Sequence, residues 1–146
     1  MEVLVVLLIL GVMAGAATTI NWSRVSPERE AGRAMRWLLR SLTKANRTGR
    51  SFTLRLSAGT SEGTLTLRWR NDPNEETFPA APGVRFQLFR HNFFAPESVY
   101  SPQWGTFTPA ATVCITKSRG AKPHYLILSG YGRVRIASSP PPGGVE

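Results

Sequence analysis

Chemically versatile side chains are few in this chain, and their spacing fits no common catalytic motif. Neither of the histidines, His91 and His124, has a second histidine, a cysteine or a carboxylate at the spacing that metal ligands need. The single cysteine, Cys114, lies in an apolar run and is expected to be a small buried hydrophobe rather than a nucleophile. Because no phosphate loop, nucleophile elbow or catalytic carboxylate pair is apparent, we expect no enzyme activity, no catalytic residue, no metal and no cofactor.

An acidic cluster formed by Asp72, Glu75 and Glu76 is the one further place where a cation could bind. Its spacing matches no standard calcium loop, so a solvated acidic turn is expected. The cluster belongs to a polar, proline-containing segment, residues 71–83, that we predict to be a loop.

Basic residues offer a more specific possibility. The chain has 18 Lys and Arg against 9 Asp and Glu, a formal net charge of +9, which points to nucleic acid, anionic lipid or an acidic protein surface as partners. In the motif at 132–135 (Gly-Arg-Val-Arg), Arg133 and Arg135 would share one face of a strand, and Gly132 would allow close backbone approach. Further cations nearby in sequence are Lys117, Arg119 and Lys122.

Such a cluster suits contacts to phosphates, which are independent of sequence and sensitive to salt. It therefore makes residues 132–135 and their neighbours a candidate DNA-binding site. The alternatives are that Arg133 and Arg135 form salt bridges within an assembly, or that they face solvent and keep the domain soluble.

An amphipathic helix should precede the strands that carry these arginines. Ser26 is a suitable N-cap, Pro27 fits the first helical position, and Thr48 and Gly49 are suited to end the helix. The apolar positions have the spacing of one helical face: Ala31, Ala34, Met35, Leu38, Leu39, Leu42 and Ala45. Residues 22–49 are therefore predicted to pack an apolar stripe on the following domain, with Trp37 at its border.

Beyond Gly49 the apolar pattern becomes alternating, which is typical of strands. A hairpin is predicted from residues 52–57 and 65–70, and further strands at 84–88, 111–116, 124–129 and 133–137. Residues 50–138 should thus form a β-rich head, and the proline- and glycine-rich residues 139–146 a disordered tail. The fold class expected is α+β.

The first segment has the character of a membrane anchor. Residues 3–20 contain no charged side chain, and a helix that crosses a bilayer needs about 20 apolar residues. A signal peptide is the alternative, and would leave a soluble β-domain after cleavage; but no Lys or Arg precedes the apolar run. We therefore expect residues 1–21 to be a transmembrane anchor, continuous with the amphipathic helix.

Three segments resemble the GspH/FimT family of minor pilins and pseudopilins. These are Glu2 with the apolar residues after it, residues 100–107 (Tyr-Ser-Pro-Gln-Trp-Gly-Thr-Phe) and residues 125–135, which end in Gly-Arg-Val-Arg. The resemblance implies a pilin-like fold, in which a long N-terminal helix packs on an antiparallel β-sheet head. It implies that Glu2 acts in assembly, by neutralising the terminal amine of a neighbouring subunit. The basic leader of the family does not precede Glu2, so we expect the natural start to lie upstream.

The resemblance also implies a function. A member of this family would be a structural subunit of a type II secretion pseudopilus or type IV pilus, held in the inner membrane by one span with its head outside the cytoplasm. Its partners would be other pilins through the N-terminal helix, prepilin peptidase for an upstream leader, and an exported protein substrate. A FimT-like protein would instead capture DNA for uptake through the Gly-Arg-Val-Arg motif. Most of the head's aromatic residues are expected in the core, with a subunit contact as the alternative: Phe89, Phe93, Phe94, Tyr100, Trp104 and Tyr131.

Overall fold

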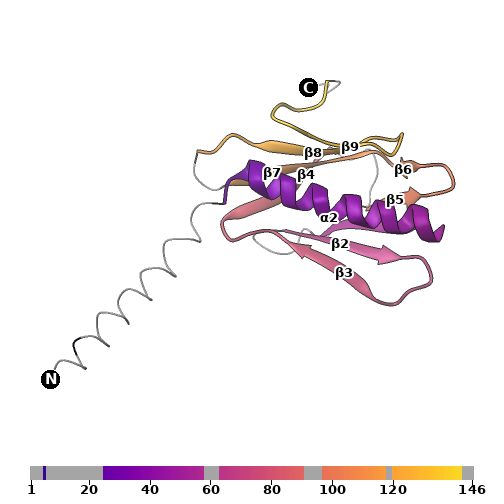
Figure 1. Cartoon of the computed structure of the whole chain (residues 1–146). Coiled ribbons are helices and arrows are strands. Elements are labelled where there is room, and N and C mark those ends of the chain that lie inside the picture. The colour runs from indigo at the N-terminus through magenta and orange to yellow at the C-terminus, as the bar shows by residue number, and fades with distance from the viewer. Residues whose placement is uncertain (1–4, 6–24, 58–62, 91–96, 118–119, 143–146) are drawn as a thin grey trace.

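A computed structural model of the chain describes residues 5, 25–57, 63–90, 97–117 and 120–142. In these residues the chain forms a helix and two antiparallel sheets, which confirms the α+β class (Figure 1). In chain order the elements are α2 (Pro27–Thr48), β1 (Phe52–Ser57), β2 (Thr64–Trp69), β3 (Glu75–Pro79), β4 (Val84–Arg90), β5 (Glu97–Ser101), β6 (Thr106–Thr108), β7 (Ala111–Lys117), β8 (His124–Leu128) and β9 (Val134–Ala137).

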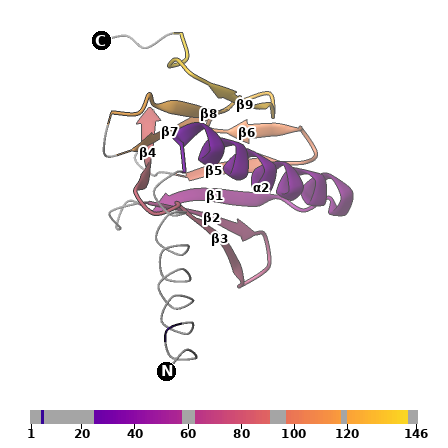
Figure 2. The same ribbon diagram turned by 60° about the vertical axis from the view of Figure 1, so that its left-hand side comes forward.

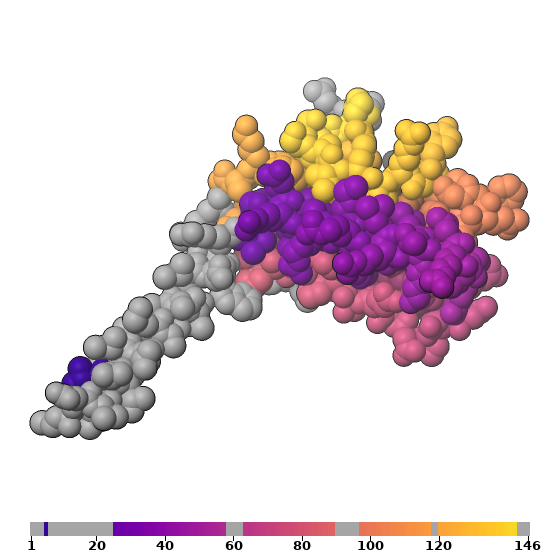
Figure 3. All heavy atoms as spheres, in the orientation of Figure 1, coloured from indigo at the N-terminus to yellow at the C-terminus, as the bar shows by residue number. Residues whose placement is uncertain are grey.

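The strands divide into two sheets that share one helix. Sheet A has the order β3-β2-β1-β5-β6, and sheet B has the order β4-β7-β8-β9. In both ribbon views, helix α2 lies across the two sheets on one side of the molecule (Figures 1 and 2). The space-filling view shows α2 between residues of β9 above and those of β2 and β3 below (Figure 3). The helix therefore covers the line along which the two sheets meet.

Both ends of α2 follow the signals in the sequence. The Ser26 hydroxyl accepts a hydrogen bond from the Arg29 amide at 3.2 Å, Pro27 stands in the first turn, and Gly49 ends the helix with φ of 68°. Ser26 itself is extended, with φ −82° and ψ 153°. Helix α2 therefore begins at Pro27, with Ser26 as its cap as expected, and the rest of the predicted segment before it, residues 22–24, lies outside the described residues.

The apolar stripe of α2 faces the sheets. Ala31, Ala34 and Ala45 are fully buried, and Leu38 is 1% exposed, whereas Leu39 is 40% exposed. Small side chains at the contact let the helix axis approach the strands closely. Trp37 lies at the border of the stripe, as expected, with its ring centroid 5.5 Å from that of Phe78 in β3.

The main core lies between α2 and the inner faces of the two sheets. Its fully buried large side chains include Phe52, Leu65, Leu67, Phe107, Ile115, Leu126 and Leu128. Because alternate strand residues point to opposite faces, sheet B has a second, smaller apolar cluster on its outer face. That cluster contains Cys114, Tyr125 and Ile127, with Phe89 and Ala137 against it. Burial of Cys114 raises the pKa of its thiol and is consistent with the expected role as a hydrophobe.

The described sheets end in strands that are poor templates for further pairing. Sheet A ends in β3, whose last residue is Pro79, and in the three-residue strand β6. Sheet B ends in β9, four residues long with Arg135 within it, and in β4, whose register shifts between Leu88 and Arg90. Prolines, charges, irregular register and short length each hinder the addition of another strand.

Three strands were not predicted. The segment 71–83 is not a continuous loop, because β3 forms within it and pairs with β2 along Thr64–Pro79 to Arg68–Glu75. This edge strand has one apolar side chain in the core, Phe78, so its alternation is too weak to see in the sequence. Strands β5 and β6 were likewise not predicted. The head also has two sheets, instead of the single antiparallel sheet that the family resemblance implied.

Some expectations fall on residues that the structure does not describe. These include Glu2, His91, Phe93, Phe94, Arg119 and nearly all of the predicted anchor. Within the described ranges, no helix combines the length and the apolar character that crossing a bilayer requires.

Glu30 is a fully buried carboxylate that ties the first turns of α2 to the sheets. One oxygen, Oε1, accepts the Ala81 amide at 2.9 Å, from the connection between β3 and β4. The other, Oε2, accepts from Arg33 Nη1 at 2.8 Å. The Arg33 guanidinium also lies 5.0 Å above the Phe78 ring. Without this carboxylate, the buried Ala81 amide would lose its hydrogen-bond acceptor on the helix.

We expect Glu30→Ala to destabilise the fold by about 1–3 kcal/mol, since a buried donor is left unsatisfied. Glu30→Gln keeps an acceptor for the Ala81 amide and should cost less. Thermal unfolding of the full chain in a neutral detergent, followed by circular dichroism, measures both. The control is Glu28→Ala, which removes an exposed acid from the same turn of α2. Equal midpoints for Glu30→Ala and Glu28→Ala would show that the buried link carries no stability.

Candidate functional site

A groove on the outer face of sheet B contains the arginines of the Gly-Arg-Val-Arg motif. It has a volume of about 1150 Å³, and its walls include Arg133, Arg135, Tyr131, Ile127 and Pro141. The strand register explains the arrangement, because Thr112 pairs with Ile127, and Ile127 with Arg135. Both arginines are exposed, and neither forms an ion pair with any described residue.

Arg133 lies one residue before β9, rather than within the strand as predicted. Its carbonyl accepts the Ser129 amide at 2.9 Å, and the Gly132 amide donates to the Ser129 carbonyl at 2.9 Å. This tight turn fixes the backbone from which Arg133 extends. Pro141 and Pro142, from the tail predicted to be disordered, also line the groove, so this part of the tail has a defined position.

The other predicted cations do not join this groove. Lys117 ends β7 and Lys122 precedes β8, both at the β7–β8 connection, whereas Arg133 follows the far end of β8. Five strand residues separate the two ends, roughly 16 Å at about 3.3 Å per residue. The cluster expected from proximity in sequence is therefore split between two ends of sheet B.

Gly132 has a structural role that the sequence did not reveal. Its φ is 73°, and a Cβ at this position would lie 2.0 Å from the Gly105 carbonyl oxygen, in the turn between β5 and β6. Both ribbon views show the β8–β9 turn beside β6 (Figures 1 and 2). Gly132 thus brings a turn of sheet B against a turn of sheet A, in addition to any approach of a ligand to its backbone.

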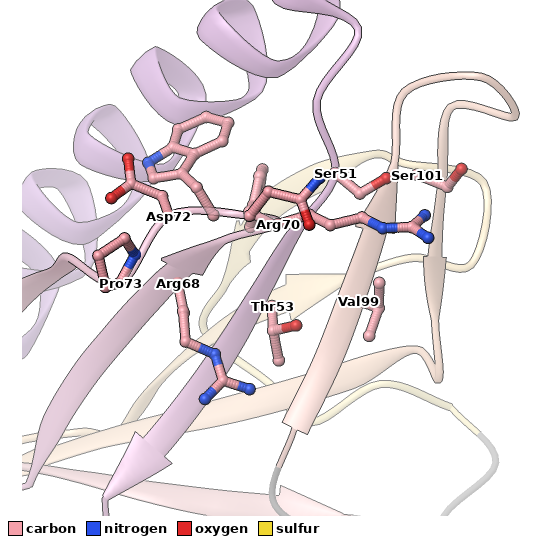
Figure 4. Close-up of a pocket in the computed structure, with 11 residues that line it drawn as sticks. Ser51, Thr53, Arg68, Arg70, Asp72, Pro73, Val99 and Ser101 are labelled. Atoms are coloured by element: carbon pink, nitrogen blue, oxygen red, sulfur yellow. The ribbon is translucent and has the colours of Figure 1, made fainter.

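A second basic groove lies on the outer face of sheet A, where no prediction had been made. It has a volume of about 700 Å³ and is lined by residues of β1, β2 and β5. Figure 4 shows the Arg70 guanidinium extended across β1 toward Val99 and Ser101, and the Arg68 side chain beside Thr53. Alternation along β2 could have placed Arg68 and Arg70 on one face.

The two grooves differ in their acidic residues. Asp72 lines the groove of sheet A, and Glu75 is the cross-strand partner of Arg68. On the same face, Arg55 pairs with Glu97 at 3.7 Å. No acidic residue lines the groove of sheet B among the residues that the structure describes. The sheet B groove is therefore the better candidate for binding a polyanion.

The acidic cluster at 72–76 is engaged in contacts within the fold. Glu76 Oε1 accepts hydrogen bonds from Trp69 Nε1 at 2.9 Å and Lys44 Nζ at 3.0 Å. The hydrogen bond from Trp69, together with Lys44, holds the pKa of the Glu76 carboxyl below its ordinary value. In the described ranges, no group of three or more His, Cys, Asp or Glu side chains is placed to hold a metal ion.

Two of the aromatic residues expected in the core lie on the surface instead. Trp104 is 74% exposed and Tyr131 is 89% exposed, whereas Tyr100 is buried and Phe89 half-buried. Most of these aromatic residues were expected in the core, and Trp104 and Tyr131 are exposed because both occupy turns, next to Gly105 and Gly132. The turn-forming glycines beside them were the signal that could have shown it.

Comparisons with known protein families, with curated proteins and with solved structures find no match to this chain.

We expect Gly132→Ala to destabilise the fold by more than Gly49→Ala does. Both glycines have a positive φ, which costs a residue with a Cβ about 1–2 kcal/mol, but nothing lies within 4 Å of a Cβ at Gly49. At position 132 the turns must also move apart, because the Gly105 oxygen occupies the space. Thermal unfolding of both variants measures the difference, and equal midpoints would contradict a role for the contact between the turns.

Proposed function

We propose that this chain is a structural subunit of a pilin-like fibre, a type II secretion pseudopilus or a type IV pilus. A membrane-held helix would join it to other pilins, its head would lie on the outer side of the inner membrane, and it would take part in protein export. The observation that carries the proposal is that helix α2, which follows the uncharged residues 3–20 closely in sequence, is buried along one face in a β-rich head.

The way α2 is held supports this role. Its stripe, the buried Glu30 and the Lys44–Glu76 ion pair connect it to the sheets along most of its length. A force or displacement applied to the N-terminal segment would therefore be transmitted to the whole head. A catalytic role has no comparable support, and the family resemblance of residues 2–12, 100–107 and 125–135 adds to the pilin interpretation.

The role of Glu2 provides the test. We expect Glu2→Gln to lower the amount of this chain in sheared fibres at least tenfold while leaving its amount in the membrane unchanged, since a buried assembly charge would be lost. Quantitative immunoblots of both fractions measure this. Glu28→Gln, an exposed acid at the start of α2, is the matched control. Wild-type incorporation of the Glu2 variant, or absence of the chain from fibres that contain other pilins, would contradict the proposal.

A second candidate function is DNA capture by the groove of sheet B, as in FimT-like pilins. The observation that favours it is that Arg133 and Arg135 line a groove that has no acidic side chain among its described residues. Phosphate contacts of this kind need no base-specific groups. The same subunit could serve in a fibre and bind DNA, so the two functions are compatible.

We expect Arg133→Ala/Arg135→Ala to weaken duplex binding by the full chain in a neutral detergent. If each arginine neutralises one phosphate, the slope of log affinity against log salt should become shallower by about two. Fluorescence anisotropy at several salt concentrations measures both quantities. Arg68→Ala/Arg70→Ala removes the same charge from sheet A and should have a much smaller effect. Equal effects of the two double variants, or no duplex binding at low salt, would eliminate this function.

A further inference from the structure

Trp104 and Tyr131 are the most exposed large hydrophobic side chains in the part of the chain that the structure describes. Other aromatic residues of the head behave differently: Phe52, Tyr100 and Phe107 are buried and in mutual contact, with ring centroids 5.0 to 6.3 Å apart. The head therefore has enough aromatic residues for its core and still places two rings in water. Exposed rings of this size are typical of a binding surface.

The two exposed rings belong to neighbouring turns. Trp104 precedes Gly105 in the β5–β6 turn, and Tyr131 precedes Gly132 in the β8–β9 turn. The Gly105 carbonyl and Gly132 lie in contact, so close that a Cβ on Gly132 would overlap the oxygen. The Tyr131 amide is fixed as well, because it donates to the Ser129 hydroxyl at 3.1 Å. Each ring thus starts one residue from a rigid contact between the sheets.

The surroundings of Tyr131 are basic, and Trp104 lies in the turn that contacts the turn of Tyr131. Tyr131 lines the sheet B groove together with Arg133 and Arg135, and that groove has no acidic member among the described residues. A lipid or a protein could also contact exposed aromatic rings. The combination of rings with a cationic groove matches best a ligand that alternates flat apolar groups with negative charges, which is the chemistry of a nucleic acid strand.

The strand must be unpaired for its bases to use the rings. In a duplex the bases stack on one another and present only their edges in the grooves, whereas in a single strand each base offers a face on which an aromatic side chain can stack. Stacking of this kind tolerates any sequence, as contacts to phosphates do.

We propose that Tyr131 and Trp104 stack on unpaired bases of single-stranded nucleic acid whose phosphates lie along Arg133 and Arg135. The proposal rests on the nucleic-acid binding proposed above and adds the form of the ligand. The arginines hold the backbone of either a duplex or a single strand, and the rings give preference to the single strand.

The test compares an oligothymidine with a duplex of the same length, both bound to the full chain in a neutral detergent. Trp104→Ala and Tyr131→Ala should each lower affinity for the single strand by about tenfold and leave affinity for the duplex within about twofold. Trp104→Phe and Tyr131→Phe keep a ring and should restore most of the affinity. Leu39→Ala, which removes exposed apolar surface from α2, should change neither. The single strand should also quench tryptophan fluorescence, and this quenching should be absent in Trp104→Phe.

Each other outcome has a definite meaning. If the alanine variants bind the single strand as the wild type does, or lose affinity for both ligands equally, base stacking is wrong. If Trp104→Ala and Tyr131→Ala bind both ligands with wild-type affinity while Arg133→Ala/Arg135→Ala abolishes duplex binding, the stacking inference fails and the nucleic-acid function stands. If the wild-type chain binds neither ligand at low salt, both fail.

Discussion

The fold depends on one buried carboxylate. Glu30 takes the Ala81 amide and the Arg33 guanidinium on its two oxygens, and so fixes the start of α2 against the connection between β3 and β4. That connection leads from sheet A to sheet B, so the same contact sets where the helix lies relative to both sheets. A fully buried charge is tolerated only because both oxygens are bonded. The alanines of the helix stripe then let the helix pack closely on the core.

Because side chains alternate along each strand, the residues that fill the core also determine which residues lie on the outer face of each sheet. In sheet B, Val113, Leu126 and Leu128 point toward α2, which sends Thr112, Ile127 and Arg135 to the other side. The basic groove is thus a direct consequence of how the core is filled. The outer face of sheet A is generated in the same way, but there the arginines have carboxylates beside them. The two faces therefore differ in where acidic side chains are placed, rather than in how many arginines they carry.

The helix and six of the strands could be predicted because their signals are local: a serine cap, a proline, a terminal glycine and clean alternation. Strand β3 could not, since an edge strand is stabilised by its neighbour and needs only Phe78 in the core. Arg133 and Arg135 were found by their spacing, whereas Lys117 and Lys122 were grouped with them wrongly because closeness in sequence ignores the length of β8. The role of Gly132 depends on Gly105, 27 residues away by their numbers, and no local pattern contains that contact.

The edge strands of the two sheets, which are poor templates for pairing, matter when many copies of the head are close together. Tethered domains collide with one another far more often than free molecules do. An unprotected edge strand on each domain would then favour pairing between sheets of different copies, and so aggregation. In this head such pairing is unfavourable at each described edge, because of Pro79 in β3, the short length of β6, the register shift in β4 and Arg135 in β9. Copies of this head at high local concentration are therefore hindered from pairing through the edges of the described sheets.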